Sequence, residues 1–398
     1  MNYPMQKKLR VLMVAACPFP YPRGTPIRIF HMAESLARRG HEIHVVTYHL
    51  GEQAEKLPYT IHRIPNVSFY QKLDPGPSFL KLFFIDFLLT IKLLSLIAVY
   101  NFDLIYAHHF EGFICALPVR LYRKLPIVFD AHTLLETELP HYGLLIGNKR
   151  LRQIGRIFDT ILPGRADHIV GISEEIVNKM IQEAKVAPER VSLITNGVEL
   201  ELFMSANPAP EMLEKDKIVL AYAGNFARYQ GIEVMLAALR NLKESNPGIT
   251  LNLISDNALD KYWDLIEELQ IETNIKHIST PFSELPQHLA NADILINPRF
   301  VSAGYPLKLL NYMAAGKPIV TLVGTSHEII HGETGWIVQG SDPLDLANGI
   351  QYLIDNPELR EQLGINARQY VKDNFMWKEK ALQIERICQK LIPTPEVA

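Results

Sequence analysis

Cysteine is scarce in this chain, with Cys17, Cys115 and Cys388 among 398 residues. None belongs to a C-x-x-C pair, so the sequence predicts neither a disulfide framework nor a zinc site. A reducing cytoplasm suits this composition. The G-x-G-x-x-G string and the Walker A phosphate loop are missing too, and the first absence argues against a nicotinamide or flavin dehydrogenase.

Neither charge sign dominates, because 40 basic side chains stand against 43 acidic ones and the formal net charge is −3. No global field therefore favours nucleic acid as a partner. The most apolar stretch, residues 79–100, is interrupted by Lys81, Asp86 and Lys92. Each charge costs about 2.5–3.5 kcal/mol at the centre of a bilayer, so the stretch is not expected to span one. Two alternatives stay open for this helix: packing on its own domain, which we favour, and peripheral contact in a membrane interface.

The first half of the chain alternates strands and helices. After the first strand, Thr25 is expected to cap a helix with Pro26 at its first position, and Gly40 to end it. This alternation is typical of a parallel sheet covered by helices on both faces. The expected strands are residues 9–16, 42–48, 104–107, 127–130, 168–171 and 191–194.

The second half repeats the pattern after a proline-containing linker, so an α/β fold with two similar domains is expected. Ligands bind beyond the carboxyl ends of such strands, and two facing domains would form a central cleft. The expected domains are residues 1–205 and 206–376, followed by a C-terminal helix, 377–398, that returns to the N-terminal domain. The expected strands are residues 218–223, 250–254, 276–278, 294–297 and 319–323.

Two loops are candidates for binding an anion. The loop GNFARYQG, residues 224–231, leads from a strand to a helix starting near Ile232, where backbone N–H groups could bind a diphosphate. The second loop contains the tight turn GYP, residues 304–306, before a helix at 307–315. Arg299 and Lys308 flank this turn, although solvated surface charges would look the same.

Six segments together resemble the retaining glycosyltransferases of family 4, which have the GT-B fold of two Rossmann-like, doubly wound domains facing a central cleft. Each segment alone is weak, but their order and spacing extend over nearly the whole chain. The segments are RGTPIRIFHMAESLARRGHEIHVVTY, FDAHT, ITNGVELELF, GNFARYQG, GYPLKLLNYMAAGKPIV and HEIIHGETGWIV.

The resemblance implies transfer of a sugar from a UDP- or GDP-linked donor to a glycan, lipid-linked or small-molecule hydroxyl, as in polysaccharide biosynthesis, with no metal or cofactor. The N-terminal domain would bind the acceptor and the C-terminal domain the nucleotide sugar. His132, which alone suggests a packed histidine at the end of a buried strand, becomes the active-site histidine. The donor-binding residues implied are Gly24, Gly224, Asn225, Arg228, Pro281, Phe282, Arg299, Gly304, Tyr305, Pro306, Leu307, Lys308 and Asn311.

The sequence departs from the family at the donor site. Ala303 and Asn311 replace two glutamates, and Asn225 and Gln230 replace a basic pair that holds the diphosphate. These changes suit the subgroup with a G-x-P-x-K turn, in which Arg228, Arg299 and Lys308 would neutralise the phosphates. They also leave two alternatives: a catalytically silent nucleotide-sugar-binding scaffold and a nucleotide-sugar 2-epimerase. The acceptor, the donor base and the oligomeric state have no decodable motif.

Overall fold

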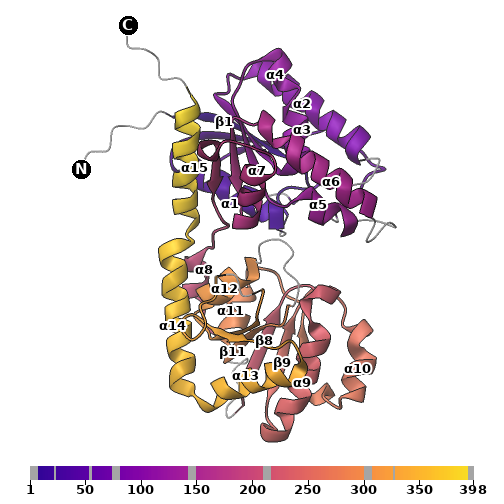
Figure 1. Ribbon diagram of the computed structural model, residues 1–398, viewed down its shortest axis with the longest axis vertical. Coiled ribbons are helices and arrows are strands. Elements are labelled where there is room, and N and C mark those ends of the chain that lie inside the picture. The colour runs from indigo at the N-terminus through magenta and orange to yellow at the C-terminus, as the bar shows by residue number, and fades with distance from the viewer. Residues whose placement is uncertain are drawn as a thin grey trace, which may run out of the picture. The chain divides into compact units, whose positions relative to one another are not determined.

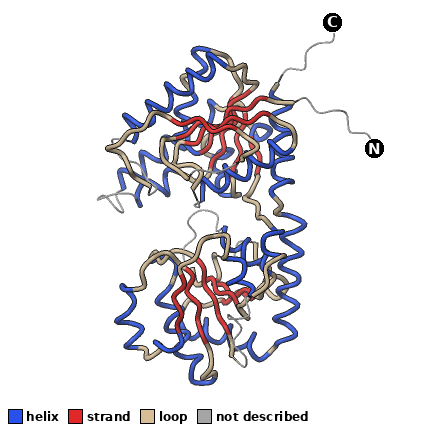
Figure 2. The backbone as a smooth tube through the Cα atoms, turned by 180° about the vertical axis from the view of Figure 1, so that it is seen from behind, coloured by secondary structure: helices blue, strands red, loops and turns tan. Residues whose placement is uncertain are grey.

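The computed structural model describes residues 8–21, 24–52, 56–73, 81–141, 149–208, 217–299, 307–325 and 328–392. The chain forms two compact units (Figure 1). Residues 1–196 and 377–398 make the first unit, and residues 197–376 make the second. Each unit is built on its own sheet, with helices around it (Figure 2).

The sheet of the first unit has seven parallel strands in the order β3-β2-β1-β4-β5-β6-β7. Its central strands are buried along their whole length, as expected for a sheet covered on both faces. The strands are β1 (Arg10–Ala15), β2 (Glu42–Thr47), β3 (Thr60–Arg63), β4 (Leu104–His108), β5 (Ile127–Ala131), β6 (His168–Gly171) and β7 (Val191–Leu193).

Helices on both sides of this sheet include the C-terminal one, α15, which packs on α1. Trp377 stacks on His31 with ring centroids 5.1 Å apart, and Ala381, Ile384 and Cys388 join the core of the unit. The helices are α1 (Gly24–Arg38), the π-helix η1 (Lys81–Ile85), α2 (Asp86–Val99), α3 (His109–Ala116), α4 (Val119–Tyr122), α5 (Leu135–Glu138), η2 (Leu139–His141), α6 (Lys149–Ile161), η3 (Pro163–Arg165), α7 (Glu174–Gln182), η4 (Pro188–Arg190) and α15 (Trp377–Leu391).

The second unit has six parallel strands in the order β10-β9-β8-β11-β12-β13. The strands are β8 (Val219–Ala223), β9 (Thr250–Ile254), β10 (Ile275–Ile278), β11 (Ile294–Asn297), β12 (Ile319–Leu322) and β13 (Trp336–Val338). The helices are α8 (Leu200–Met204), η6 (Arg228–Gln230), α9 (Ile232–Ser245), η7 (Asp260–Tyr262), α10 (Trp263–Glu268), η8 (Glu272–Asn274), α11 (Leu285–Ala290), α12 (Leu307–Ala315), α13 (Pro343–Asp355) and α14 (Pro357–Asn374).

The expected α/β fold with two parallel sheets is confirmed, but the division between the units lies earlier than the expected boundary after residue 205. Residues 197–205 belong to the second unit because Leu200 and Phe203 of α8 pack in its core. The backbone N–H of Val198 also donates to the carbonyl of Phe375 within that unit at 2.8 Å.

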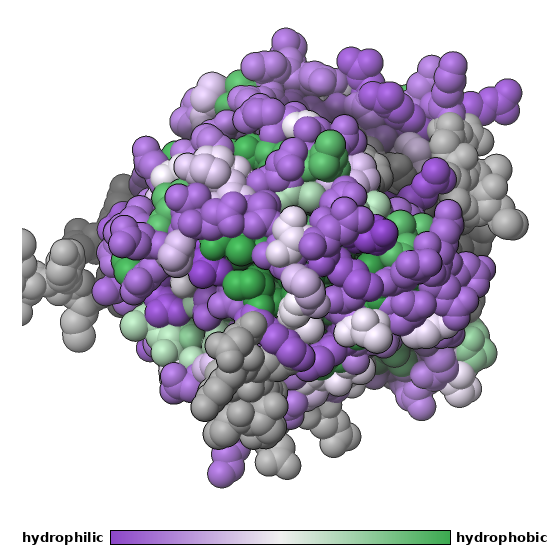
Figure 3. Space-filling model, turned by 90° about the horizontal axis from the view of Figure 1, so that it is seen from below, coloured by the Kyte–Doolittle hydropathy of each residue, from purple (hydrophilic) through white to green (hydrophobic). Residues whose placement is uncertain are grey.

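The apolar stretch around α2 packs on its own unit through Leu89, Leu93 and Ile97, which are buried. Its other side leaves Phe87 and Ile91 exposed. Among the described residues, no helix is both long enough and apolar enough to cross a membrane. On the face of the molecule that Figure 3 shows, hydrophilic residues predominate and apolar residues gather in small groups.

Candidate functional site

Arg28 and Asp130 form a buried ion pair at the carboxyl edge of the first sheet. The α1 residue Arg28 donates to both oxygens of Asp130 on β5, with Nε–Oδ2 and Nη2–Oδ1 distances of 2.9 and 3.0 Å. The same guanidinium donates to the carbonyls of Ile194 and Thr195 after β7. Such a bidentate pair, with its remaining donors also used, joins α1, β5 and the end of β7 rigidly.

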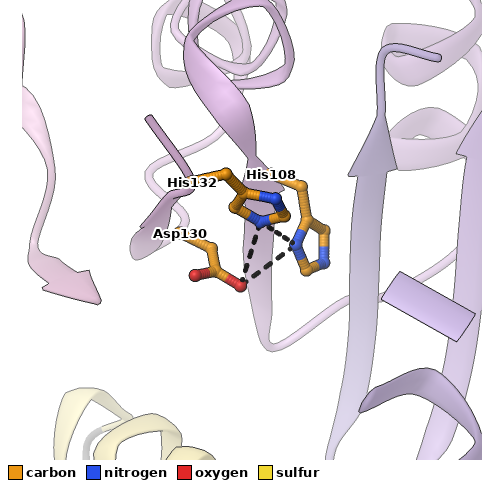
Figure 4. Close-up of side chains that lie close together, drawn as sticks. All are labelled: His108, Asp130 and His132. Carbon is orange, nitrogen blue, oxygen red and sulfur yellow. Dashed lines mark hydrogen bonds and ion pairs between the residues drawn. The ribbon is translucent and has the colours of Figure 1, made fainter. Parts of the chain in front are cut away.

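Two histidines lie against this carboxylate, and Figure 4 shows the three side chains pointing toward one another. Oδ2 of Asp130 lies 3.2 Å from Nδ1 of His108 and 3.4 Å from Nε2 of His132. The second ring nitrogen of His132, Nδ1, lies 3.0 Å from the hydroxyl of Thr25. Because a carboxylate only accepts, a hydrogen bond to Asp130 requires His132 to donate from Nε2 and to accept from Thr25 at Nδ1. Nε2 of His132 also lies 3.4 Å from Nδ1 of His108.

The structure therefore changes the expected role of Thr25. The helix α1 begins at Gly24, and the Thr25 hydroxyl orients the His132 ring. Gly24 itself lies beside open space, because a side-chain carbon there would meet no heavy atom within 4 Å.

Burial and charge set the protonation of this cluster. Burial alone would raise the pKa of Asp130, but the Arg28 guanidinium, followed by His132, holds it well below its usual range. Burial lowers the pKa of His132 to about 4, against the smaller opposing effect of Asp130. An ionised Asp130 beside a neutral His132 is the arrangement expected near pH 7.

His108, Asp130 and His132 also form a geometric candidate for a metal site, because their ligand atoms lie within 4.8 Å of one another. Asp130, however, already accepts two hydrogen bonds from Arg28 and one, at 3.0 Å, from the hydroxyl of Tyr106. A cation added here would face the Arg28 guanidinium. The donor set therefore fits a hydrogen-bonded network better than a divalent ion.

A second charged cluster surrounds His109, the first residue of α3. The backbone of His109 itself is left-handed, with φ of 61°. Its ring contacts the carboxylates of Glu111 and Glu138, the latter at 3.1 Å, and Lys81 donates to Glu111 at 2.6 Å. Burial alone would lower the pKa of His109, but Glu111 and then Glu138 raise it well above its usual value. Sequence reasoning missed this cluster. Its one local sign is the pair His108-His109 at the end of β4.

In the second unit, the loop after β8 turns through two glycines with positive φ, Gly224 at 149° and Gly231 at 72°. The side chain of Asn225 accepts from the backbone N–H of Ala227 at 3.1 Å, so this residue shapes the loop. Arg228 lies next in this loop with its side chain exposed. The loop leads into α9 at Ile232, as expected from the sequence.

Lys308 and Gln230 join this loop to the start of α12. The ammonium of Lys308 donates to Oε1 of Gln230 at 2.6 Å and lies 4.6 Å from the centre of the Tyr222 ring. The guanidinium of Arg299, which is buried, lies 5.2 Å from the centre of the Tyr229 ring. Burial and then the positive charge of Arg299 lower the pKa of Lys308 to about 7. Two basic side chains thus lie in this part of the unit, Lys308 in the first turn of α12 and Arg299 two residues after β11.

The remaining predicted site residues are placed only in part. Leu307 and Asn311 are half-buried on α12, while Pro281 and Phe282 are exposed after β10. Gly304, Tyr305 and Pro306, with the neighbouring Ala303, lie outside the described residues. Within the second unit the structure therefore brings together Gln230, Arg299 and Lys308.

Comparison with known proteins agrees with this architecture. Residues 22–202 match the family model described as Glycosyltransferase Family 4, and residues 204–370 match Glycosyl transferases group 1. D-inositol 3-phosphate glycosyltransferase of Corynebacterium diphtheriae is 24% identical over 304 residues, covering 72% of this chain and 70% of that protein.

Two solved structures share the fold over nearly the whole chain. Sucrose-phosphate synthase from Thermosynechococcus elongatus superimposes with a TM-score of 0.78 at 21% identity, covering 96% of this chain and 99% of that one. The Anabaena protein HepE, in complex with UDP, gives a TM-score of 0.75 at 19% identity, covering 96% and 100%.

The fold and the two family matches define a glycosyltransferase with the GT-B fold. Within that class the chain is similar to family 4, and the expectation of a glycosyltransferase is confirmed.

Proposed function

We propose that this protein is a retaining glycosyltransferase that moves a sugar from a UDP- or GDP-linked donor to a hydroxyl of a glycan, glycolipid or small molecule. It uses no metal ion and acts in polysaccharide biosynthesis. Its place is the cytoplasm, with peripheral contact at the inner face of the membrane. The N-terminal unit binds the acceptor and the C-terminal unit binds the donor.

The observation that carries the proposal is the pair of cations, Arg299 and Lys308, next to the N-terminus of α12. Arg299 is buried, and its charge contributes to the lowered pKa of Lys308. Like charges held together in this way are stabilised when an anion binds near them, and the helix start favours an anion in the same place. A nucleoside diphosphate has the required charge, and the Anabaena protein HepE has been solved in complex with UDP.

In sugar transfer the acceptor oxygen forms a bond to the anomeric carbon while the bond from that carbon to the phosphate oxygen breaks, and negative charge develops on the leaving diphosphate. Arg299 and Lys308 stabilise this charge, while Arg228 lies on the adjoining loop. The departing phosphate oxygen takes the proton of the acceptor hydroxyl, so no separate base is required. The neutral His132, held by Asp130 and Thr25, orients the donor sugar and does not act as the base.

A panel of UDP- and GDP-linked sugars tests the proposal. Purified protein is assayed for a thermal shift with each donor and for nucleotide release with and without a crude glycolipid extract. We expect one donor to raise the melting temperature and to release its nucleotide only when acceptor is present. A thermal shift without release under any acceptor would favour the silent scaffold, and release without acceptor would favour hydrolysis or epimerisation.

A further inference from the structure

The helix α6 packs on its own unit through small and polar positions. Gly155 lies so close to α5 that a side-chain carbon there would come within 2.4 Å of the Leu135 carbonyl oxygen. One turn later, the buried Asp159 accepts hydrogen bonds from the backbone N–H groups of Leu135 and Glu136, at 3.0 and 2.9 Å. The side of α6 that faces the protein is therefore held by close backbone approach and hydrogen bonds.

The apolar side of α6 faces outward. Ile154, Ile157, Phe158 and Ile161 follow the spacing of one helix face, and 44%, 55%, 40% and 57% of their surfaces are exposed. An amphipathic helix of a soluble domain normally turns such a stripe toward the core. Four large apolar side chains on one exposed stripe indicate that this side of the helix is an interaction surface for another protein or a membrane.

The charges on α6 complement an anionic surface. The exposed charged side chains of this helix are Lys149, Arg150, Arg152 and Arg156, all of them basic, and its one acidic residue is the buried Asp159. Arg152 and Arg156 lie on the side of the helix away from the apolar stripe and pair with Glu136 and Glu183 of the same unit, at 3.1 and 3.3 Å. A helix with apolar residues on one side and mostly basic residues on the other is typical of segments that lie in the interface of an anionic bilayer. A second copy of the chain suits the face less well, because symmetric pairing would bring basic residues against basic residues.

A second apolar surface lies beyond the end of α6. Nη1 of Arg165, in η3, donates to the carbonyl of Ile161 at 3.2 Å. Arg165 also lines an open apolar pocket at the junction of α3 and α4, together with Ile114, Leu117, Pro118, Arg120 and Leu121. We call the α6 stripe, its basic residues and this pocket the α6 face.

We propose that the α6 face docks the protein on the surface of an anionic lipid bilayer, with the stripe of Ile154, Ile157, Phe158 and Ile161 inserted among the headgroups. This places a membrane contact on α6. For the stretch around α2 the sequence favoured packing on its own domain and left membrane contact as the alternative. The docking surface stands on its own observations. The additional inference that the acceptor is carried by a membrane lipid rests on the proposed function.

Flotation with lipid vesicles tests the docking. The full chain is mixed with vesicles of phosphatidylcholine alone or of phosphatidylcholine with phosphatidylglycerol, at low and high salt. We expect binding to the phosphatidylglycerol vesicles that weakens at high salt. The double variant Ile157→Glu/Ile161→Glu should bind at least about tenfold less, because it places two charges in the inserted stripe.

A matched control uses exposed apolar residues of the second unit. Leu344 and Ile365 are 57% and 55% exposed, so Leu344→Glu/Ile365→Glu makes the same chemical change at similarly exposed positions. The control should float like the wild type, and both double variants should keep the wild-type melting temperature. Wild-type protein that ignores phosphatidylglycerol, or an α6 variant that floats normally, would overturn the proposal.

Two further readouts separate the explanations. Nucleotide binding is measured on the same samples. If the wild type does not float but still binds UDP or GDP, the docking surface and the peripheral membrane contact are refuted, while the proposed sugar transfer stands. Size-exclusion chromatography with light scattering gives the mass of each variant. A wild-type dimer that becomes monomeric in Ile157→Glu/Ile161→Glu would assign the face to a second copy and overturn the membrane proposal.

Discussion

Lys308 on α12 donates a 2.6 Å hydrogen bond to the side-chain oxygen of Gln230, which lies 78 positions earlier in the chain. The resemblance to family 4 places a basic residue where this chain has Gln230. A second cation at that position would repel Lys308, whereas the neutral amide accepts from it. In the proposed donor site, Gln230 would therefore orient the ammonium of Lys308, and Lys308 would supply the charge that faces the diphosphate.

Replacing Lys308 with methionine should weaken binding of the donor nucleotide about 10- to 100-fold, because a charge-assisted bond to the diphosphate is lost while the length of the side chain is kept. Isothermal titration of UDP and GDP measures this change. Lys372→Met, an exposed position near the end of α14, is the control and should leave the affinity unchanged. Equal affinities for wild type and Lys308→Met would remove Lys308 from the diphosphate site.

The same substitution should stabilise the protein when no nucleotide is bound. The pKa of Lys308 falls from 10.5 to about 7 on folding, mainly because of burial. The unfolded chain thus binds more protons between pH 7 and pH 10.5, so this lysine opposes folding most at low pH and its effect fades as pH rises through that window. We expect Lys308→Met to raise the free energy of unfolding at pH 7 by about 1–2 kcal/mol.

Urea unfolding at several pH values checks this expectation. The stability advantage of Lys308→Met over the wild type should shrink between pH 7 and pH 9. A variant less stable than the wild type at pH 7 would mean that the hydrogen bond to Gln230 outweighs the burial of the charge.

Much of the fold could be predicted because buried parallel strands have strong local patterns. The strands at 168–171, 250–254 and 294–297 and the helix at 307–315 end where the sequence indicates. The strands β3 and β13 were missed: each lies at the edge of a sheet, β3 has polar residues at alternate positions, and β13 has three residues. Pairing with a neighbour determines such short edge strands more than their own propensity does.

The site was predictable only where a motif marked it. The segment FDAHT marked His132 as the expected active-site residue, but the Arg28–Asp130 pair joins residues 102 positions apart, and no motif indicated that they meet. The fold creates it, because the carboxyl ends of parallel strands and the helix α1 meet at the same edge of the sheet. The one available sign was Asp130 itself, two positions before His132 and so on the same side of an extended strand.

Removing one partner of the Arg28–Asp130 pair should be strongly destabilising. Both side chains are buried, so Arg28→Met leaves a carboxylate without its main counter-charge, and we expect a loss of about 3–5 kcal/mol in the free energy of unfolding. The double variant Arg28→Met/Asp130→Leu should recover part of this loss, because no buried charge is left unpaired.

A double-mutant cycle in urea measures the coupling between the two residues. Arg240→Met serves as the control, since Arg240 forms an exposed ion pair with Glu244 one turn along α9 and should change stability by less than about 1 kcal/mol. Strictly additive losses at Arg28 and Asp130 would show that the pair is not energetically coupled.

His132 should not set the pH dependence of sugar transfer near neutrality. Burial lowers its pKa to about 4, and its ring nitrogens face Asp130 and Thr25, so the ring stays neutral from about pH 5 upward. We expect His132→Ala to lower kcat while leaving the shape of the kcat/KM profile between pH 5.5 and pH 8.5 unchanged. Because the pKa of Lys308 is about 7, we expect the kcat/KM profile of the wild type to have an inflection near pH 7. This inflection should disappear in Lys308→Arg, because arginine stays charged throughout this range. An inflection that vanishes in His132→Ala and persists in Lys308→Arg would assign the titrating group to His132 and restore it as a base.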